Sequence, residues 1–251
     1  MLTEDVPRSG LARALSKSGY CSRSSASKLV REGRVRLNGR VVRDPGKPVV
    51  LGEDSIEVDG QKLALAKKLY FVMNKPRGIV TTAHDEKGRD TVYSLLPKSQ
   101  AWVAPVGRLD KASEGLLLLT NDSDWGARIV SPEMHIDKTY HVQIAAIADE
   151  DLIQRLTSGI RTAEGISLRV KRVAIVRVGQ KNSWLEIVLD EGKNRQIRRL
   201  LAAVGIEVLR LIRIAIGPLQ LGDLPKGQVR DVTQEEKTAL DRAAASSNAK
   251  S

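Results

Sequence analysis

The feature that most constrains the fold is a short, fully apolar run in the middle of the chain, residues 116–119 of the stretch PVGRLDKASEGLLLLTND (105–122). Four consecutive leucines between a glycine and a Thr-Asn-Asp sequence predict a strand buried on both faces, or a short buried helical turn. Arg108 and Asp110 precede the run on a charged turn between two apolar segments, where a rigid scaffold can aim a carboxylate. On spacing alone, the simpler interpretation is an ion pair that ties a surface turn.

Residues 11–42 have the spacing of two short helices followed by a hairpin. Ser22 is a favourable N-cap for the second helix, and Gly33 would end it. Asn38-Gly39 between alternating apolar residues is the strongest short signal for a β-hairpin. Four cations concentrate on the second helix and the turn after it: Arg23, Lys28, Arg31 and Arg34. For a generic helix, a solvated charged face would explain them.

After Lys67-Lys68, which marks a linker, the segment YFVMNKPRGIVTT predicts a strand that runs into a Lys-Pro turn. Lys75 lies at this turn, where solvation and contact with RNA are equally reasonable interpretations. Further along, KTYHVQI (138–144) alternates strictly, which places Tyr140 on one face of a strand with two apolar residues. A tyrosine in that position is ordinarily a core or rim residue.

The last part of the chain predicts a helix over 149–159, strands over 168–178 and 184–189, and a helix within GKNRQIRRLLAAVG. Thr233-Gln-Glu-Glu is a capping box that opens a final helix, and residues 241–251 are expected to be a disordered tail. The exposed start of the helix in GKNRQIRRLLAAVG carries a group of cations that would attract phosphate: Lys193, Arg195, Arg198 and Arg199.

Composition narrows the class of partner. A formal net charge of +11 favours a polyanion, nucleic acid first and an anionic membrane surface second. Aromatic residues are only 3%, so contacts to phosphate and RNA shape should outweigh base stacking. With the single Cys21, no internal disulfide can form, and with no signal peptide and no long apolar run the expected location is the cytoplasm. Neither the three histidines nor Cys21 has metal-ligand spacing, so no metal is expected.

The order of these motifs resembles a known family. GRLD with a following Ser-containing turn and GLLLLT, then KTY, then GKNRQIRRL are similar to the signatures of pseudouridine synthases, in the branch that modifies ribosomal RNA and carries an N-terminal S4 domain. The resemblance covers roughly residues 10–236. It implies an α+β fold: an S4-like RNA-binding domain over 9–66, then a catalytic domain over 69–240 with a mixed, largely antiparallel sheet flanked by helices.

The same resemblance implies roles for individual residues. Asp110 would be the catalytic carboxylate, Tyr140 would lie against the target base, and Arg198 would pair with Asp110. Isomerisation gains and loses no atom, so no cofactor is expected, and a monomer is. Lys193 stands where many relatives have arginine, which keeps the charge. The cations expected to bind RNA are Arg23, Lys28, Arg31, Arg34, Lys75, Arg108, Lys193, Arg195 and Arg199.

Three alternatives stay open at this point. The chain could be a non-catalytic RNA-binding or ribosome-assembly protein in which the S4 domain does the work. A carboxylate-dependent glycosidase would need a second acid, and Glu114 is the only acidic neighbour close in sequence. Within the pseudouridine synthases, GKNRQIRRL and the closing segment (210–233) look closer to enzymes of the large ribosomal subunit than of the small one. The expected target is therefore a stem-loop of large-subunit RNA.

Overall fold

The computed structural model describes residues 8–83, 87–97, 101–162 and 165–248. The chain divides into two compact units. One contains the N-terminal part up to Tyr70 together with Pro97–Ala104 and Leu119–Ser123, and the other contains Phe71–Leu96, Pro105–Leu118 and the chain from Asp124 onward.

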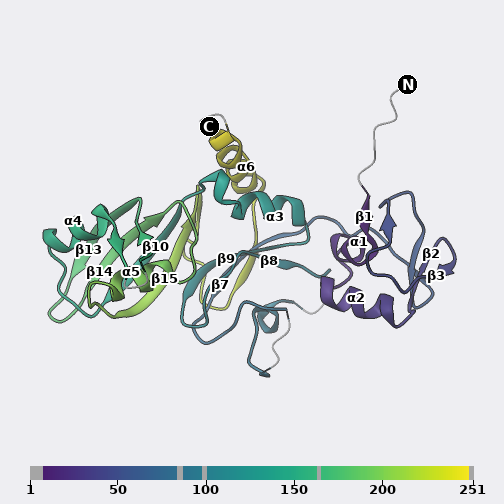
Figure 1. Ribbon diagram of the computed structural model, residues 1–251, viewed down its shortest axis with the longest axis horizontal. Coiled ribbons are helices and arrows are strands. Elements are labelled where there is room, and N and C mark those ends of the chain that lie inside the picture. The colour runs from purple at the N-terminus through teal and green to yellow at the C-terminus, as the bar shows by residue number, and fades with distance from the viewer. Residues whose placement is uncertain (1–7, 84–86, 98–100, 163–164, 249–251) are drawn as a thin grey trace. The chain divides into compact units, whose positions relative to one another are not determined.

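Among its described residues, the first unit contains two helices and two small sheets (Figure 1). The predicted Ser22 cap is confirmed, because its side chain accepts a hydrogen bond from the Ser25 backbone N–H at 3.1 Å. Both Asn38-Gly39 and Asp59-Gly60 have positive φ, as tight hairpin turns of this type require. The elements are β1 (Ser9–Gly10), α1 (Leu11–Lys17), α2 (Arg23–Arg31), β2 (Val35–Leu37), β3 (Arg40–Val41), β4 (Pro48–Val49), β5 (Ile56–Val58) and β6 (Gln61–Lys62).

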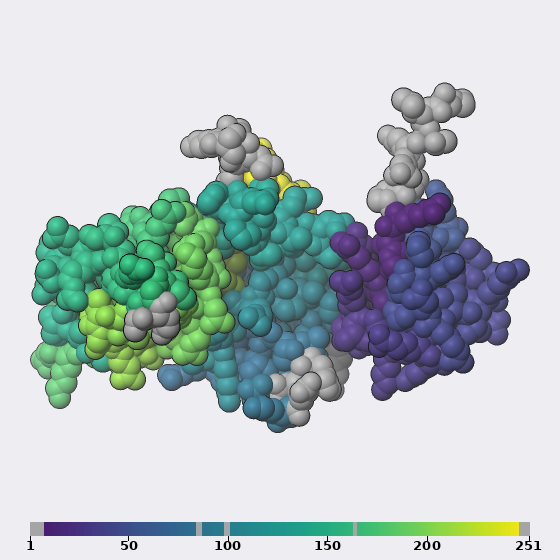
Figure 2. All heavy atoms as spheres, viewed as in Figure 1, coloured from purple at the N-terminus to yellow at the C-terminus, as the bar shows by residue number. Residues whose placement is uncertain are grey.

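A separate apolar core holds this unit together. Leu11 and Leu15 of α1 pack with Val30 of α2 and with Val35 and Ile56 of the sheet, and all of these side chains are buried. In the space-filling view the N-terminal part of this unit is coloured purple to blue (Figure 2). The apolar side chains of α2 pack within the unit, and its charged face therefore lies on the surface.

The Lys67-Lys68 linker is fixed in place. Asn121 accepts a hydrogen bond from the Leu69 N–H at 2.8 Å and donates to the Lys67 carbonyl at 2.9 Å. Thr120 donates to the Leu69 carbonyl at 2.6 Å. The chain just after the leucine run therefore belongs with the first unit, a grouping that no local pattern in the sequence indicates.

The second unit is built on a nine-stranded, mixed and largely antiparallel sheet of order β13-β14-β10-β15-β9-β7-β17, with β8 paired to β9 and β16 to β15 (Figure 1). The β15–β9 pair is parallel. The fold is thus α+β, as predicted. The strands are β7 (Tyr70–Lys75), β8 (Ala104–Val106), β9 (Glu114–Thr120), β10 (Lys138–Ile144), β13 (Arg172–Val178), β14 (Ser183–Leu189), β15 (Val208–Ile216), β16 (Leu219–Gln220) and β17 (Val229–Asp231). A separate pair joins β11 (Ile160–Arg161) to β12 (Ser167–Leu168), so the predicted strand over 168–178 is divided in two.

Strand β9 confirms the prediction from the leucine run, because all seven of its residues are buried. Two helices, α4 (Glu150–Ser158) and α5 (Gln196–Ala202), pack their apolar side chains against one face of the sheet. That core includes Val142 and Ile144 of β10, and Tyr140 packs against its edge. Tyr140 therefore points to the helix-covered face, at the place where that cover ends.

The final helix, α6, spans Gln234–Asn248, which corrects the expectation of a disordered tail from residue 241. The capping box is confirmed, with the Glu236 N–H donating to Thr233 at 3.2 Å and the Thr233 N–H donating to Glu236 at 2.9 Å. Leu240 and Ala244 lie four residues apart and are buried. This apolar contact extends the helix through a polar, low-complexity sequence, whereas residues 249–251 lie outside the described residues. The remaining helical elements are α3 (Ser123–Val130), η1 (Val92–Leu95) and η2 (Pro132–Met134).

Candidate active site

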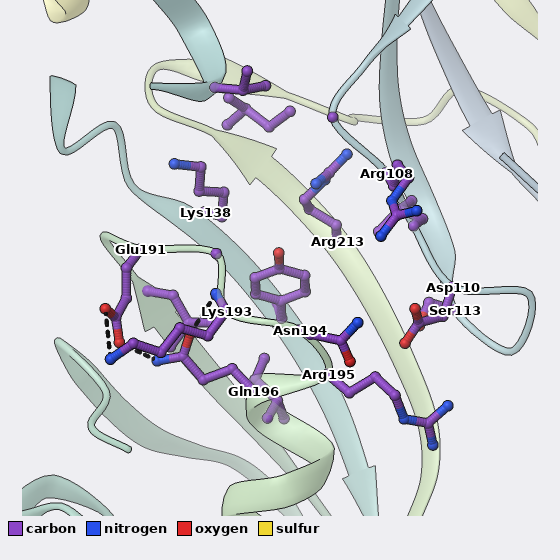
Figure 3. A pocket seen from close by; sticks show the side chains of 18 of the residues that line it. Arg108, Asp110, Ser113, Lys138, Glu191, Lys193, Asn194, Arg195, Gln196 and Arg213 are labelled. Atoms are coloured by element: carbon purple, nitrogen blue, oxygen red, sulfur yellow. Dashed lines mark hydrogen bonds and ion pairs between the residues drawn. The ribbon is translucent and has the colours of Figure 1, made fainter. Parts of the chain in front are cut away.

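A pocket of about 570 Å³ opens where the turn before β9 meets β10, β15 and the segment that leads into α5 (Figure 3). This volume is within the range of about 300–1,000 Å³ that ligand sites usually have. Cationic side chains outnumber acidic ones in its lining, with Arg108, Lys138, Lys193, Arg195 and Arg213 against Asp110 and Glu191. Such a pocket suits an anionic or electron-rich ligand.

The turn that carries Asp110 is held by its backbone. Each carbonyl from residue 109 to 113 accepts a hydrogen bond from another part of the second unit or from within the turn, and these bonds leave the Asp110 side chain uninvolved. Lys75 donates to the carbonyls of Asp110 at 3.2 Å and Ser113 at 2.9 Å. The carbonyls of Leu109, Lys111 and Ala112 accept from the Thr81 hydroxyl at 2.8 Å, the Gly78 N–H at 2.8 Å and the Arg198 guanidinium at 3.1 Å. A carboxylate on so constrained a turn has a fixed position before any ligand binds.

Lys75 is a central part of this support, which corrects its prediction as an RNA contact. Its side chain is 0% exposed and its Nζ donates to three carbonyls, those of Pro76, Asp110 and Ser113. Burial lowers the pKa of Lys75 to about 8, although the charges of Asp110 and Glu114 act in the opposite direction. An ammonium group enclosed in this way cannot reach a phosphate. The sequence predicted either a solvated turn or an RNA contact, because two of the acceptors of Lys75 are 35 and 38 residues away.

Arg198 also supports the turn, but by contacts other than those expected. Its Nη2 donates to the Ala112 carbonyl at 3.1 Å and its Nη1 to the Val208 carbonyl at 3.3 Å. In the described part of the chain, no ion pair or hydrogen bond joins its guanidinium to the Asp110 carboxylate. Burial and the charge of Arg195 lower the pKa of Arg198, and the charge of Asp110 opposes them. Arg198 is therefore close enough to Asp110 to act on it electrostatically, while it is tied to backbone.

The segment before α5 is organised by Gln196, which the sequence analysis did not single out. This buried side chain accepts from the Lys193 N–H at 3.1 Å and donates to the Glu191 carboxylate at 2.7 Å and the Arg169 carbonyl at 2.9 Å. The Lys193 ammonium pairs with Glu191 at 3.0 Å. Arg195 has a left-handed backbone with φ of 49° and an exposed side chain at the pocket. Of these cations, Arg195 has the more open position.

Three side chains of β10 and β15 form the floor of the pocket beside this segment. Tyr140 is directly opposite Arg213 in the antiparallel pairing, so both lie on the same face of the sheet. Lys138 lies two residues before Tyr140 and lines the same pocket. Burial lowers the pKa of Lys138 and the Arg213 charge lowers it further, against Asp137 and Asp190. Sequence reasoning found Tyr140 but neither cation. The signal for Arg213 was a charge at an inward position of the apolar strand RLIRIAI.

Glu114 is not a second free acid. It is 3% exposed, accepts two hydrogen bonds from Arg210 at 3.0 and 3.1 Å, and pairs with Lys226 at 2.6 Å. Burial raises the pKa of Glu114, but its bonds to Arg210 and Lys226 outweigh burial and lower it. Because Glu114 is neutralised and does not line the pocket, the geometry disfavours a glycosidase with paired catalytic carboxylates.

The other predicted RNA-binding residues differ in how accessible their side chains are. Arg23, Lys28 and Arg31 are exposed on α2, and Arg108 is exposed at the pocket. Arg34 is exposed as well, but its guanidinium is engaged by Asp59 at 2.9 and 2.6 Å. Arg199 is half-buried on α5. The structure thus leaves α2 and the pocket rim as the more open basic surfaces.

Two broader features of the described residues bear on function. No helix among them is long and apolar enough to cross a membrane. Nor do they contain a group of three or more histidine, cysteine, aspartate or glutamate side chains that could hold a metal ion.

Comparison with known proteins gives matches for both units. Residues 69–203 match the RNA pseudouridylate synthase family, and residues 10–55 match the S4 domain. The chain is 37% identical over 231 residues to a protein of Bacillus subtilis (strain 168) named ribosomal large subunit pseudouridine synthase B, covering 92% of this chain and 94% of the relative. It is 40% identical over 230 residues to an uncharacterized RNA pseudouridine synthase of Aquifex aeolicus (strain VF5), covering 91% and 92%.

A solved structure matches over the same length. A crystal structure of a pseudouridylate synthase superposes with a TM-score of 0.63 at 31% sequence identity, covering 92% of this chain and 99% of that one. Sequence and structure thus agree over both units, and the matched region includes the turn with Asp110, strand β10 and the start of α5.

Proposed function

Because this chain belongs to the RNA pseudouridylate synthase family, we propose that it isomerises one uridine of large-subunit ribosomal RNA, with Asp110 as the catalytic carboxylate. The observation that carries the catalytic assignment is the turn itself. Five consecutive carbonyls are hydrogen-bonded, while the described residues provide the Asp110 carboxylate with no hydrogen-bond or ion-pair partner. This arrangement is what a group that must act on a ligand requires.

The reaction breaks the bond from ribose C1′ to N1 of uracil and forms one from C1′ to C5. The electron pair of the broken bond stays on the base, C5 later loses its proton, and N1 gains one. A carboxylate can act as nucleophile or as base in this sequence without a metal. Asp110 lies on the pocket wall, where it would face the sugar of a uridine that has left its stack.

Tyr140 and Arg198 would assist in different ways. Tyr140 lies at the open edge of the helix-covered core, so its ring offers a flat surface against which the uracil can pack. Arg198 holds the Ala112 carbonyl and contributes positive charge near Asp110, which favours the ionised carboxylate in a site emptied of water. We assign it a positioning and electrostatic role.

RNA binding would be shared between the two units. The exposed cations of α2, namely Arg23, Lys28 and Arg31, would hold structured RNA by its backbone, as in other S4 domains. At the pocket, Arg108 and Arg195 are exposed and would meet the phosphates that flank the target uridine. Contacts of this kind fix position and weaken with added salt, but they read little sequence.

The choice of the large subunit rests on the Bacillus subtilis relative, whose name specifies that subunit, and on the GKNRQIRRL motif. The test is to incubate the purified protein separately with unmodified large- and small-subunit ribosomal RNA and to map pseudouridine in each. We expect one modified position in a stem-loop of the large-subunit RNA. Modification confined to the small-subunit RNA would refute the target, and tight RNA binding with no modification of either would favour a non-catalytic assembly protein.

A further inference from the structure

Arg213 is an almost fully buried guanidinium that lines the pocket and uses few of its donors. Its side chain belongs to a residue that is 6% exposed, and its Nε donates to the Leu116 carbonyl at 2.8 Å. Its Nη2 is buried without an acceptor among the residues that the structure describes. An arginine has five N–H donors, and a buried donor without a partner is costly. Such a group is best explained by an acceptor that a ligand supplies.

Strand β9 fixes this guanidinium before any ligand binds. Arg213 pairs with Gly115 in the parallel β15–β9 contact. A Cβ on Gly115 would lie 2.3 Å from the Arg213 carbonyl oxygen, and the φ of Gly115 is +100°. Only glycine lets the two backbones approach this closely, and the Nε bond to Leu116 then orients the side chain. The donors of Arg213 are therefore preorganised relative to the turn that holds Asp110.

The charged side chains beside Arg213 in the pocket wall are cations, and its neighbours include the residue proposed to hold the base. Tyr140 is its cross-strand partner, at a Cβ separation that is typically about 4.5–5.5 Å. Figure 3 shows Arg213 between Lys138 and Arg108, on the same side of the pocket. A wall of this composition calls for an electron-rich group, and the edge of a base packed on Tyr140 would provide one.

We propose, on the basis of the proposed function, that the Nη donors of Arg213 bind a ring carbonyl oxygen, O2 or O4, of the target uracil. When the C1′–N1 bond breaks, its electron pair stays on the base and is delocalised onto these two oxygens. A fixed guanidinium at that place stabilises the charge as it develops, without a reorganisation cost at the moment of reaction. Arg213 would then contribute both to recognition of uracil and to the rate of the chemical step.

A phosphate is the other acceptor that an arginine commonly binds, and the position of Arg213 argues against it. A flipped nucleotide places its base in the depth of the pocket, and its phosphates stay at the opening with the strand. The exposed cations Arg108, Lys193 and Arg195 already occupy the opening, whereas Arg213 is 94% buried in its wall.

The test compares wild type with Arg213→Lys and Arg213→Gln on synthetic stem-loops that contain the mapped uridine. Three single-atom changes are made at this nucleotide: 2-thiouridine, 4-thiouridine, and a phosphorothioate at its 5′ phosphate. Single-turnover rates and RNA affinities are measured for every combination. Arg177→Lys is the matched control, because Arg177 is exposed on β13, away from the pocket lining.

We expect the wild type to lose about 10- to 100-fold in rate with sulfur at one of the two ring positions, since sulfur is a poor acceptor for a charged donor. The Arg213 variants should be about 10²- to 10³-fold slower on unmodified RNA, with affinity within a few-fold, and should show no further loss with that thio-substituted RNA. A purely structural role would slow all substrates equally and leave the thio effect unchanged, which would overturn the proposal.

Two other results would also overturn it. Coupling to the phosphorothioate alone would make Arg213 a phosphate contact, and a wild type indifferent to both thiouridines would exclude a carbonyl bond even if neither variant folds. Failure of the proposed function is distinguishable, because the wild type would then modify no uridine in unmodified RNA.

Discussion

Replacement of Lys75 by methionine tests whether catalysis depends on the supported turn. Methionine has a similar length and no donor, so the change removes the bonds to Pro76, Asp110 and Ser113. Losing three charge-assisted bonds would cost about 4.5 kcal/mol at the low end of their usual value. Replacing the buried ammonium also removes the free-energy cost of burying its charge in the folded protein. The fall in the pKa of Lys75 from 10.5 to about 8 corresponds to about 3 kcal/mol.

These two terms nearly cancel, so the Lys75→Met protein should fold with its free energy of unfolding reduced by about 0–2 kcal/mol. Activity should respond differently, because a carboxylate displaced by about 1 Å loses about 100-fold in rate. Single-turnover isomerisation and thermal unfolding, measured on the same preparation, separate these effects. Lys181→Met, an exposed lysine in the β13–β14 turn, is the matched control.

A Lys75→Met variant that isomerises within threefold of wild type would refute the idea that this ammonium holds the Asp110 turn. A variant that loses activity only in proportion to the unfolded fraction would refute it as well.

Three further predictions concern pH, strand contact and the first unit. Because the pKa of Lys75 is about 8 in the folded protein and 10.5 in the unfolded protein, the free energy of unfolding should rise between these pH values as the folded protein loses this proton first. Activity should nevertheless fall above pH 8, because the neutral amine has one N–H donor fewer for the turn. Stopped-time assays and denaturant titrations at each pH would show whether activity and stability change in opposite directions. Gly115→Ala should be severely destabilised or fail to fold, since the added Cβ would lie 2.3 Å from the Arg213 carbonyl oxygen. A thermal unfolding temperature within 3 °C of wild type, which corresponds to roughly less than 1 kcal/mol, would contradict the close approach of the two strands. Deletion of residues 1–66 should weaken RNA binding and its salt dependence. Hydrogen exchange should increase at the Trp102 N–H, because this group loses the Gly19 carbonyl as its acceptor, and unchanged protection of Trp102 would contradict the grouping of residues 97–104 with the first unit.

Local signals in the sequence were sufficient for much of the fold. The hairpin at Asn38-Gly39, the Ser22 cap and the buried strand β9 each depend on a few consecutive residues, and each was predicted correctly. The tail was misjudged because its composition is that of a disordered segment, and the burial of Leu240 and Ala244 depends on residues far away in the chain.

Long-range contacts account for most of what the sequence left hidden at the site. Lys75 suggested a solvated turn, because nothing nearby indicates that it donates to carbonyls of the Asp110 turn. The contact of Arg198 with the Ala112 carbonyl spans 86 residues and could not be deduced from the helix that carries it. The order of strands in the sheet, which brings Arg213 beside both Tyr140 and Gly115, is equally absent from any local pattern.

The measurement that tests the central claim most directly is single-turnover isomerisation by Asp110→Asn, with RNA affinity determined in parallel. Asparagine keeps the size of the side chain and the backbone bonds of the turn but removes the carboxylate. We expect no detectable pseudouridine and an affinity within a few-fold of wild type, since binding is spread over many cations. Residual turnover above about 1% of wild type, a loss of less than about 3 kcal/mol in transition-state stabilisation, would remove Asp110 from the catalytic role.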